Sequence, residues 1–275
     1  MDRYAVLGNP VTHSLSPRIH ALFAEQTGEP ISYLALEAPL DQFSQFVAGL
    51  HQEGYQGMNV TLPFKEEAWQ LSESRSKRAE RAGAVNTLIR TATGYKGDNT
   101  DGAGLVSDLT RNLNITLQNR DILILGAGGA VRGVLQPLLA ASPKSLHIGN
   151  RTAERARQLA TDFSPLGPVS ASGLDGPYPG QYDLIINGTA ASIQGRIPSL
   201  PDGLLREGGV CYDMMYSPSG ETAFVQWGRE QGAAVSSDGL GMLVEQAAES
   251  FYLWRDIRPG TRAVLETLRD NLSAS

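Results

Sequence analysis

The hydrophobic pattern of the chain alternates between short aliphatic runs and longer stretches with apolar residues at helical spacing. The clearest case is Asp121–Arg155, where the run Ile122–Leu125 predicts a buried parallel strand. Apolar residues at 131, 134, 135, 138 and 139 follow at helical spacing. A second short strand, Leu146–Ile148, completes a predicted βαβ unit.

The same hydrophobic pattern predicts strands and helices in the rest of the chain. Strands are predicted at Tyr4–Gly8, Ile31–Leu36, Gly57–Thr61, Gly83–Ile89, Tyr182–Asn187, Val210–Met214 and Ala233–Val235. Helices are predicted from Pro17 and after Lys65, and at Leu40–Gln52, Ala103–Leu113, Ala153–Phe163, Phe224–Gln231, Leu243–Trp254 and Arg262–Leu272. Thr93-Gly94 predicts a hairpin turn, and residues 164–180, rich in Gly, Pro and Ser, predict a loop. The alternation predicts an α/β fold of two domains.

Composition narrows the class of protein. The chain has 275 residues, of which 41% are apolar and 19% charged, so we expect folded domains. A net charge of −6 argues against nucleic-acid and acidic-membrane partners. There is no apolar run of about 18 residues and no signal-peptide pattern, so we expect a cytoplasmic enzyme. Cys211 is the single cysteine, and its apolar neighbours predict a buried strand thiol. The histidines are scattered, so we expect no metal site. We expect the basic cluster Arg75–Arg81 to be a solvated helix face.

The turn between the first strand and helix of the βαβ unit is rich in glycine. It reads Gly126, Ala127, Gly128, Gly129, Ala130. In a strand-to-helix turn this spacing is a dinucleotide fingerprint: Gly126 permits the tight turn, Gly128 lets the backbone approach a pyrophosphate, and Ala130 allows close packing. The anion would then lie at the helix N-terminus, where free N–H groups point.

The end of the next strand indicates which dinucleotide binds. An NAD site carries an acidic residue there, whereas this chain has Asn150, Arg151 and Thr152, with Arg155 one turn later. Two guanidiniums and a hydroxyl suit a 2′-phosphate, so we infer NADP. The alternative is a structural βαβ unit with solvated arginines.

The first half of the chain offers polar candidates at strand ends. Ser14 and Ser16 precede Pro17, and they fit equally well a helix cap or a carboxylate or polyol site. Lys65 lies near a helix start, where the macrodipole disfavours a cation and helps a proton-transfer lysine, although it could be an ordinary surface lysine. Asp98 and Asp101 are either turn or cap carboxylates or charged partners of Lys65.

Ligands of open α/β sheets bind at the carboxyl ends of strands. Residues at those ends form two sets. The first domain contributes Ser14, Ser16, Thr61, Lys65, Asn86 and Asp101; the second contributes Gly126–Ala130, Asn150, Arg151, Thr189, Met214 and Gly239. A polar set facing a dinucleotide set across a two-domain cleft describes a dehydrogenase, in which Lys65, poised by Asp101, could supply the proton that the carbonyl oxygen gains.

Taken together, these residues resemble the pattern of the shikimate dehydrogenase family. The matching segments run from end to end: residues 8–10 (GNP), 13–17 (HSLSP), 59–65 (NVTLPFK), 83–87 (GAVNT), 97–102 (GDNTDG), 126–130 (GAGGA), 150–152 (NRT), 213–216 (DMMY), 239–243 (GLGML) and 246–248 (QAA). The resemblance implies reversible NADPH-dependent reduction of 3-dehydroshikimate to shikimate, a step of aromatic amino-acid biosynthesis, with no metal.

The resemblance also implies roles for individual residues. Lys65 and Asp101 would be the catalytic pair. Ser14, Ser16, Asn59, Thr61, Asn86, Tyr216 and Gln246 would contact the substrate together with that pair. Gly126–Ala130, Asn150, Arg151, Thr152, Arg155, Thr189, Met214, Gly239 and Met242 would hold NADP.

Because the C-terminal helices of that family return to the first domain, we expect a substrate domain of residues 1–102 plus 239–275. Residues 103–238 would form a Rossmann-like NADP domain, and the chain would be a monomer or a homodimer. One departure is the loop at 187–195, where Gly188 and a shifted glycine differ from the family pattern. Two rivals are a quinate/shikimate paralogue that uses NAD, which the Asn150-Arg151 pair disfavours, and a cofactor-sensing regulator, which Lys65 and Asp101 disfavour.

Overall fold

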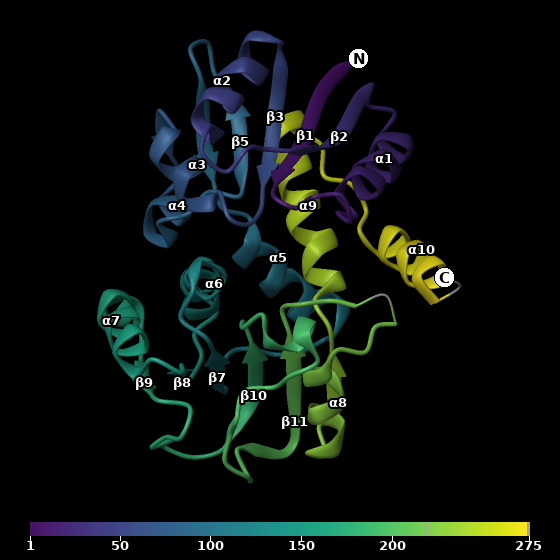
Figure 1. Ribbon diagram of the computed structural model, residues 1–275. Coiled ribbons are helices and arrows are strands. Elements are labelled where there is room, and N and C mark those ends of the chain that lie inside the picture. The colour runs from purple at the N-terminus through teal and green to yellow at the C-terminus, as the bar shows by residue number, and fades with distance from the viewer. Residues whose placement is uncertain (218, 274–275) are drawn as a thin grey trace. The chain divides into compact units, whose positions relative to one another are not determined.

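The computed structural model describes residues 1–217 and 219–273, which divide into two compact units (Figure 1). Unit 1 is Met1–Gly104 with Val244–Val264, and unit 2 is Leu105–Leu243 with the residues from Leu265 onward. The expected substrate domain also included residues 239–243 and 265–275. The described part of these segments falls in unit 2, where Gly239 N–H donates to Met215 O at 2.9 Å and Arg269 pairs with Asp238.

Unit 1 is built on a mixed sheet with the strand order β2-β1-β3-β5-β6-β4. The strands are β1 (Asp2–Gly8), β2 (Ile31–Glu37), β3 (Tyr55–Val60), β4 (Ser74–Arg75), β5 (Thr87–Arg90) and β6 (Tyr95–Asp98). β1 is parallel to β2 and β3, whereas β5 is antiparallel to both β3 and β6. The predicted hairpin at Thr93-Gly94 is therefore confirmed as the β5–β6 connection.

Helices cover both faces of this sheet. They are α1 (Ser16–Thr27), α2 (Phe43–Gln52), α3 (Lys65–Leu71), α4 (Lys77–Ala82), the start of α5 (Asp101–Ser107), and the part of α9 (Leu240–Arg255) that follows residue 243. Alternate residues of β1 point to opposite faces. Ala5 and Leu7 belong to the core that α2, α3 and α4 complete. Tyr4 packs against Trp254 of α9 with tilted rings, whose centroids lie 4.7 Å apart.

Unit 2 is built on a parallel sheet with the strand order β12-β11-β10-β7-β8-β9. Its strands are β7 (Asp121–Leu125), β8 (Ser145–Gly149), β9 (Val169–Ser172), β10 (Tyr182–Asn187), β11 (Leu205–Asp213) and β12 (Val235–Ser237). Its helices are α6 (Gly129–Ala140), α7 (Ala153–Phe163), α8 (Ala223–Glu230), most of α10 (Arg262–Ser273), a π-helix at Asp108–Asn112 and 3₁₀ turns at Ser164–Leu166 and Ala191–Gln194. The predicted α/β class with mostly parallel sheets is confirmed.

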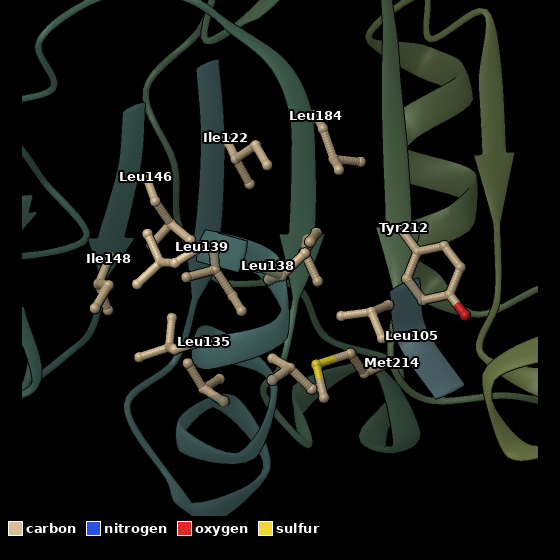
Figure 2. Packing of buried hydrophobic residues seen from close by; sticks show 14 of the residues in the cluster. Leu105, Ile122, Leu135, Leu138, Leu139, Leu146, Ile148, Leu184, Tyr212 and Met214 are labelled. Carbon is tan, nitrogen blue, oxygen red and sulfur yellow. The ribbon is translucent and has the colours of Figure 1, made fainter. Parts of the chain in front are cut away.

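The core of unit 2 lies mainly between the sheet and α6 and α7 (Figure 2). Ile122 and Leu146 from the strands meet Leu135 and Leu138 from α6, all fully buried. The opposite sheet face, with Leu123 and its neighbours, packs against α8. Strands buried on both faces need nearly continuous apolar runs, which is why the sequence identified β7 and β10 well.

Several predictions were wrong in detail. Residues 169–172, predicted as loop, form the edge strand β9. This strand carries no aliphatic run, but the hydroxyls of Ser170 and Ser172 hydrogen-bond the ring of His147 on β8, at 2.8 and 2.9 Å.

The cluster 75–81 is not a uniformly solvated face, because Arg78 is largely buried in ion pairs. The buried strand thiol of Cys211 is confirmed, and burial raises the pKa of that thiol to about 12.

None of the helices in residues 1–217 and 219–273 combines the length and apolar character that a bilayer-crossing segment needs.

Candidate active site

Lys65 and Asp101 form an ion pair in unit 1. Lys65 is the first residue of α3, and Asp101 is the first residue of α5, three residues after the last residue of β6. Lys65 Nζ lies 2.6 Å from Asp101 Oδ2, and the two side chains are 20% and 10% exposed. Two segments 36 residues apart in sequence thus place an ammonium and a carboxylate in direct contact at the polar edge of the sheet.

Asn86 links this pair to its surroundings. Its Nδ2 donates to Asp101 Oδ1 at 2.7 Å and to Thr100 Oγ1 at 2.9 Å. Its Oδ1 accepts the backbone N–H of Thr100 at 2.8 Å. Because Asn86 is 3% exposed and fully engaged, its amide holds the far oxygen of Asp101 in a fixed orientation.

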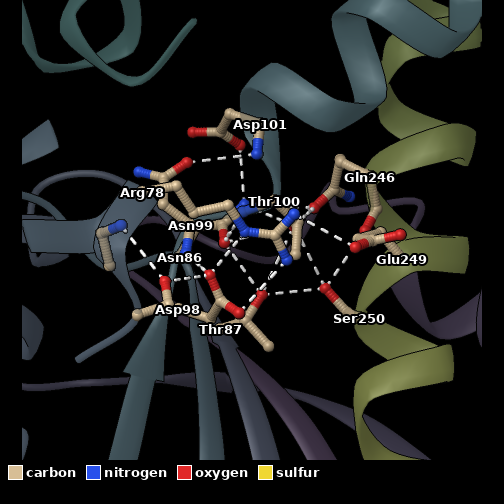
Figure 3. A network of polar contacts seen from close by, with 12 residues as sticks. Arg78, Asn86, Thr87, Asp98, Asn99, Thr100, Asp101, Gln246, Glu249 and Ser250 are labelled. Carbon is tan, nitrogen blue, oxygen red and sulfur yellow. Dashed lines mark hydrogen bonds and ion pairs between the residues drawn. The ribbon is translucent and has the colours of Figure 1, made fainter. Parts of the chain in front are cut away.

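Gln246 of α9 joins the same network (Figure 3). Its Oε1 accepts from Asn86 Nδ2 at 3.4 Å and from Thr100 Oγ1 at 3.3 Å. One turn later, Ser250 Oγ accepts from Asn59 Nδ2 at 2.9 Å. The sequence placed Gln246 here only through family resemblance, because its partners lie about 150 residues away.

Asn59 and Ser16 lie near a buried tyrosine. Tyr33 O–H donates to Asn59 Oδ1 at 2.7 Å. Burial raises the pKa of Tyr33 well above its ordinary value, although a hydrogen bond with Ser16 opposes the shift, so the phenol stays neutral. The His20 ring stacks on the Tyr33 ring, with the centroids 4.1 Å apart. Burial lowers the pKa of His20 to about 3, which keeps the imidazole uncharged.

The two serines do not cap α1 through their side chains in the usual way. The N-cap residue is Leu15, whose side chain makes no capping hydrogen bond. Ser14 Oγ accepts the N–H of Ser16, the first residue of α1, at 3.2 Å. Ser14 is half-buried, whereas Ser16 is 5% exposed. Thr61 follows β3, and its methyl group packs against Gly8, where an added Cβ would lie 2.5 Å from it.

In unit 2 the glycine loop lies between β7 and α6, as predicted. Gly126 has φ +108°, a conformation that strongly favours glycine. Gly128 is the N-cap of α6, and no described side chain caps that helix or places an acid in its first turn. Cβ atoms at Gly128 and Gly129 would meet open space, so no neighbouring side chain of the described residues covers the start of this helix on that side. Ala127 and Ala130 are half-buried beside them.

The residues after β8 are exposed cations and polar groups. Asn150 donates from Nδ2 to Thr152 O at 2.9 Å, which fixes the turn into α7. Arg151, Thr152 and Arg155 are exposed, and neither arginine pairs with an acid in the described chain. A helix N-terminus with open N–H groups and nearby unpaired guanidiniums fits a ligand that carries a pyrophosphate and a further phosphate.

The loops after β10 and β11 bring the remaining predicted cofactor residues together. Thr189 N–H and O–H both donate to Asn187 Oδ1, at 3.1 and 2.7 Å. A Cβ on Gly188 would lie 2.4 Å from Val131 and 3.2 Å from the Met214 sulfur, so this position requires glycine. Gly239 packs on the Met214 carbonyl, and Met242 joins the same core.

Asp213, at the end of β11, forms hydrogen bonds with residues of these loops. It is fully buried and accepts from Asn187 Nδ2 at 3.0 Å, Thr222 O–H at 2.6 Å and Met215 N–H at 3.1 Å. Burial raises the pKa of Asp213, and these hydrogen bonds only partly oppose it. Tyr216 is half-buried nearby, and burial followed by the Asp238 charge raises its pKa.

Sequence reasoning missed several residues of these networks: Tyr33, Arg78, Thr87, Thr100, Asp213, Glu249 and Ser250. Thr87, Thr100 and Asp213 lie within the segments that match the family, but they carry no signal of their own. Asp98 was a candidate partner of Lys65, whereas the structure pairs it with Arg78 at 2.6 Å.

The chain is similar to known proteins over nearly its whole length. Family models match in three segments: the shikimate dehydrogenase substrate binding domain at residues 6–88, shikimate / quinate 5-dehydrogenase at 108–193, and the shikimate 5′-dehydrogenase C-terminal domain at 239–269. The shikimate dehydrogenase (NADP(+)) of Thioalkalivibrio sulfidiphilus is 56% identical over 270 residues, 98% of each chain. That of Methylococcus capsulatus is 54% identical, covering 97% of this chain and 96% of the relative.

Solved structures agree as well. Shikimate 5-dehydrogenase from Thermus thermophilus, solved with NADP(H) and shikimate, is 35% identical with a TM-score of 0.87, covering 98% of this chain and 99% of the other. An Ael1 enzyme from Pseudomonas putida is 42% identical with a TM-score of 0.92, and the alignment covers 98% of both chains. The chain therefore belongs to the shikimate dehydrogenase family.

Proposed function

We propose that Lys65 and Asp101 are the proton-transfer pair with which this chain interconverts 3-dehydroshikimate and shikimate. That NADP-dependent reaction, a step of aromatic amino-acid biosynthesis, is the activity of the family. The observation that carries the proposal is the 2.6 Å contact between Lys65 Nζ and Asp101 Oδ2 at a polar edge. A lysine held by a carboxylate can give a proton to a carbonyl oxygen and recover it from the alcohol.

The polar groups around the pair support a substrate with several hydroxyls and one carboxylate. Amide and hydroxyl side chains suit ring hydroxyls, and we assign Asn59, Thr61, Asn86 and Gln246 to them, with Lys65 and Asp101 at the reacting position. The hydroxyls of Ser14, Ser16 and Tyr216 are assigned to the substrate carboxylate. Among the described residues Ser14 Oγ accepts one backbone N–H, which leaves its own proton for an anion.

The cofactor residues fit a dinucleotide that carries a 2′-phosphate. We assign the pyrophosphate to the loop Gly126–Ala130 and the 2′-phosphate to Asn150, Arg151, Thr152 and Arg155. Thr189, Met214, Gly239 and Met242 would border the nicotinamide end. When bound, NADPH supplies the hydride, while this chain's residues bind, orient and exchange the proton. Unit 1 with its returning helix would then be the substrate domain, and unit 2 the NADP domain.

Two further expectations stay predictions: a cytoplasmic location, and a monomeric or homodimeric state.

The decisive experiment measures NADP⁺ reduction with shikimate, with quinate and NAD⁺ in parallel. We expect shikimate with NADP⁺ to be the preferred pair. Lys65→Ala should lower kcat by about 10²–10⁴-fold with substrate binding largely kept. Lys77→Ala, which changes an exposed lysine of α4, serves as the matched control and should leave kcat unchanged. Wild-type turnover in Lys65→Ala would refute the acid–base assignment, and equal turnover with NAD⁺ would refute the NADP preference.

A further inference from the structure

Arg78 makes a fork of hydrogen bonds to one carboxylate and reaches a second one (Figure 3). Its Nε lies 2.6 Å from Asp98 Oδ1 and its Nη2 lies 3.1 Å from Asp98 Oδ2. Its Nη1 lies 3.1 Å from Glu249 Oε1. The Arg78 side chain is 24% exposed and Asp98 is 6% exposed, so α4, the β6 end and α9 meet at one largely desolvated guanidinium.

Asp98 fixes the turn that carries Asp101. Asp98 Oδ1 accepts the N–H of Asn99 at 2.7 Å and the Ser76 hydroxyl at 2.5 Å, and its backbone O accepts the N–H of Asn86 at 3.0 Å. Asn99 Oδ1 in turn accepts the N–H of Asp101 at 3.1 Å, which sets the first residue of α5. The position of the Asp101 carboxylate therefore depends on a chain of bonds that begins at Arg78.

Glu249 makes the same connection to α9. It lies three residues after Gln246, so both project from nearly the same face of the helix. Gln246 reaches Asn86 and Thr100, and Glu249 reaches Arg78 and Arg258, the latter at 2.7 Å. Holding Glu249 thus limits how far Gln246 can rotate or slide relative to the turn at 98–101.

We propose that Arg78 is a positioning residue for the Lys65–Asp101 pair, which it holds through Asp98 while it orients Gln246 through Glu249. Arg78 contacts neither Lys65 nor Asp101, so its effect on turnover is indirect. Only a planar guanidinium can bind both oxygens of Asp98 and still reach a second carboxylate. The inference rests on the proposed function, because it assigns a role in the reaction of that pair.

The test compares Arg78→Ala, Arg78→Lys and Arg81→Ala. Arg81 is exposed on the same helix and serves as the matched control. Assays run well below each melting temperature, with circular dichroism giving the folded fraction, so that kcat is expressed per folded molecule. Arg78→Ala should lower this kcat by about 10- to 100-fold, because small displacements of catalytic groups have effects of that size. The KM for NADP⁺ should stay unchanged while the KM for shikimate rises.

Arg78→Lys keeps one charged contact but loses the fork, so its kcat should lie between those of the wild type and Arg78→Ala. If Arg78→Ala fails to fold, Arg78→Lys carries the test alone, and a wild-type kcat per folded molecule would overturn the proposal. A loss in Arg78→Ala that is wholly explained by unfolded protein would also overturn it. The proposed function fails separately, if the wild type and Arg81→Ala do not oxidise shikimate.

Discussion

The side chains around the Lys65–Asp101 pair in unit 1 and those at the ends of β8 and β11 in unit 2 differ in how their charges are paired. In unit 1, Arg78 and Lys65 are largely buried and each has a carboxylate partner within 2.6 Å. At the corresponding strand ends of unit 2, the carboxylate of Asp213 is buried with neutral donors as its described partners, while Arg151 and Arg155 are exposed and pair with no acid in residues 1–217 and 219–273.

We interpret this difference through the functions proposed for the two units. Ion pairs would hold the polar side chains of unit 1 in place for a small polar substrate. The glycines, amides and exposed arginines of unit 2 would suit a ligand that carries its own phosphates. Four predictions test this comparison, from the largest expected effect to the smallest.

Asp98→Asn should destabilise unit 1 strongly. The substitution leaves the Arg78 fork partly unpaired in a desolvated place, and breaking a buried pair costs about 3 kcal/mol or more. Urea titration would measure the free energy of unfolding. Glu80→Gln is the control: it removes the 56% exposed partner of Arg75 and should change that free energy by less than about 1 kcal/mol. Equal effects of the two variants would show that burial of the pair does not matter.

Gly188→Ala should destabilise unit 2 by overpacking rather than by charge. The new methyl group would lie 2.4 Å from Val131 and 3.2 Å from the backbone O of Leu125, so we expect a loss of about 1–3 kcal/mol in thermal or urea unfolding. Gly129→Ala, with open space around its Cβ on α6, should be neutral or slightly stabilising when measured without cofactor. A neutral Gly188→Ala would mean that the loop shifts freely.

Arg151→Ala should weaken the binding of NADPH far more than the binding of NADH, because only NADPH carries the 2′-phosphate. A charged hydrogen bond contributes about 1.5–3 kcal/mol, and exposure of Arg151 places the expected loss near the lower end, about tenfold in Kd. Fluorescence titration of both cofactors measures it. Arg157→Ala, which removes an exposed arginine paired with Glu154 on the same helix, should leave both affinities unchanged. Similar losses for NADPH and NADH would refute the phosphate role of Arg151.

Asp213→Asn should alter how stability depends on pH. Burial raises the pKa of Asp213 above its ordinary value of 3.8, so the stabilisation linked to its protonated form is present below pH 3.8 and is lost as the pH rises through the folded-state pKa. The asparagine variant does not titrate, so its unfolding free energy should rise relative to the wild type as the pH increases above 3.8.

Asp183→Asn is the control for this pH dependence, because its effect on stability should have the opposite sign. Burial alone would raise the pKa of Asp183, but hydrogen bonds from Asp121 N–H and Arg206 outweigh it and hold the pKa below 3.8. This variant should therefore lose stability relative to the wild type as the pH rises toward 3.8. A parallel pH dependence in both variants would contradict the difference between the two carboxylates.

The sequence by itself determined the βαβ unit, the glycine loop, the parallel strands and the pairing candidates Lys65 and Asp101. Aliphatic runs, helical spacing and glycine spacing are local, so they can be read without knowing what lies nearby in space. The edge strand β9 was missed because its hydroxyls are explained only by His147 on the neighbouring strand.

Only the tertiary structure decided which carboxylate serves which cation. Asp98 and Asp101 are three residues apart, and the local sequence offers both as partners of Lys65, although the strand-end pattern and the family resemblance favour Asp101. The β6–α5 turn directs Asp98 to Arg78 and Asp101 to Lys65. It also gave Gln246 and Glu249 their partners across more than 140 residues. Electrostatic pairing depends on distance and burial in space, and no local pattern along the chain encodes either of them.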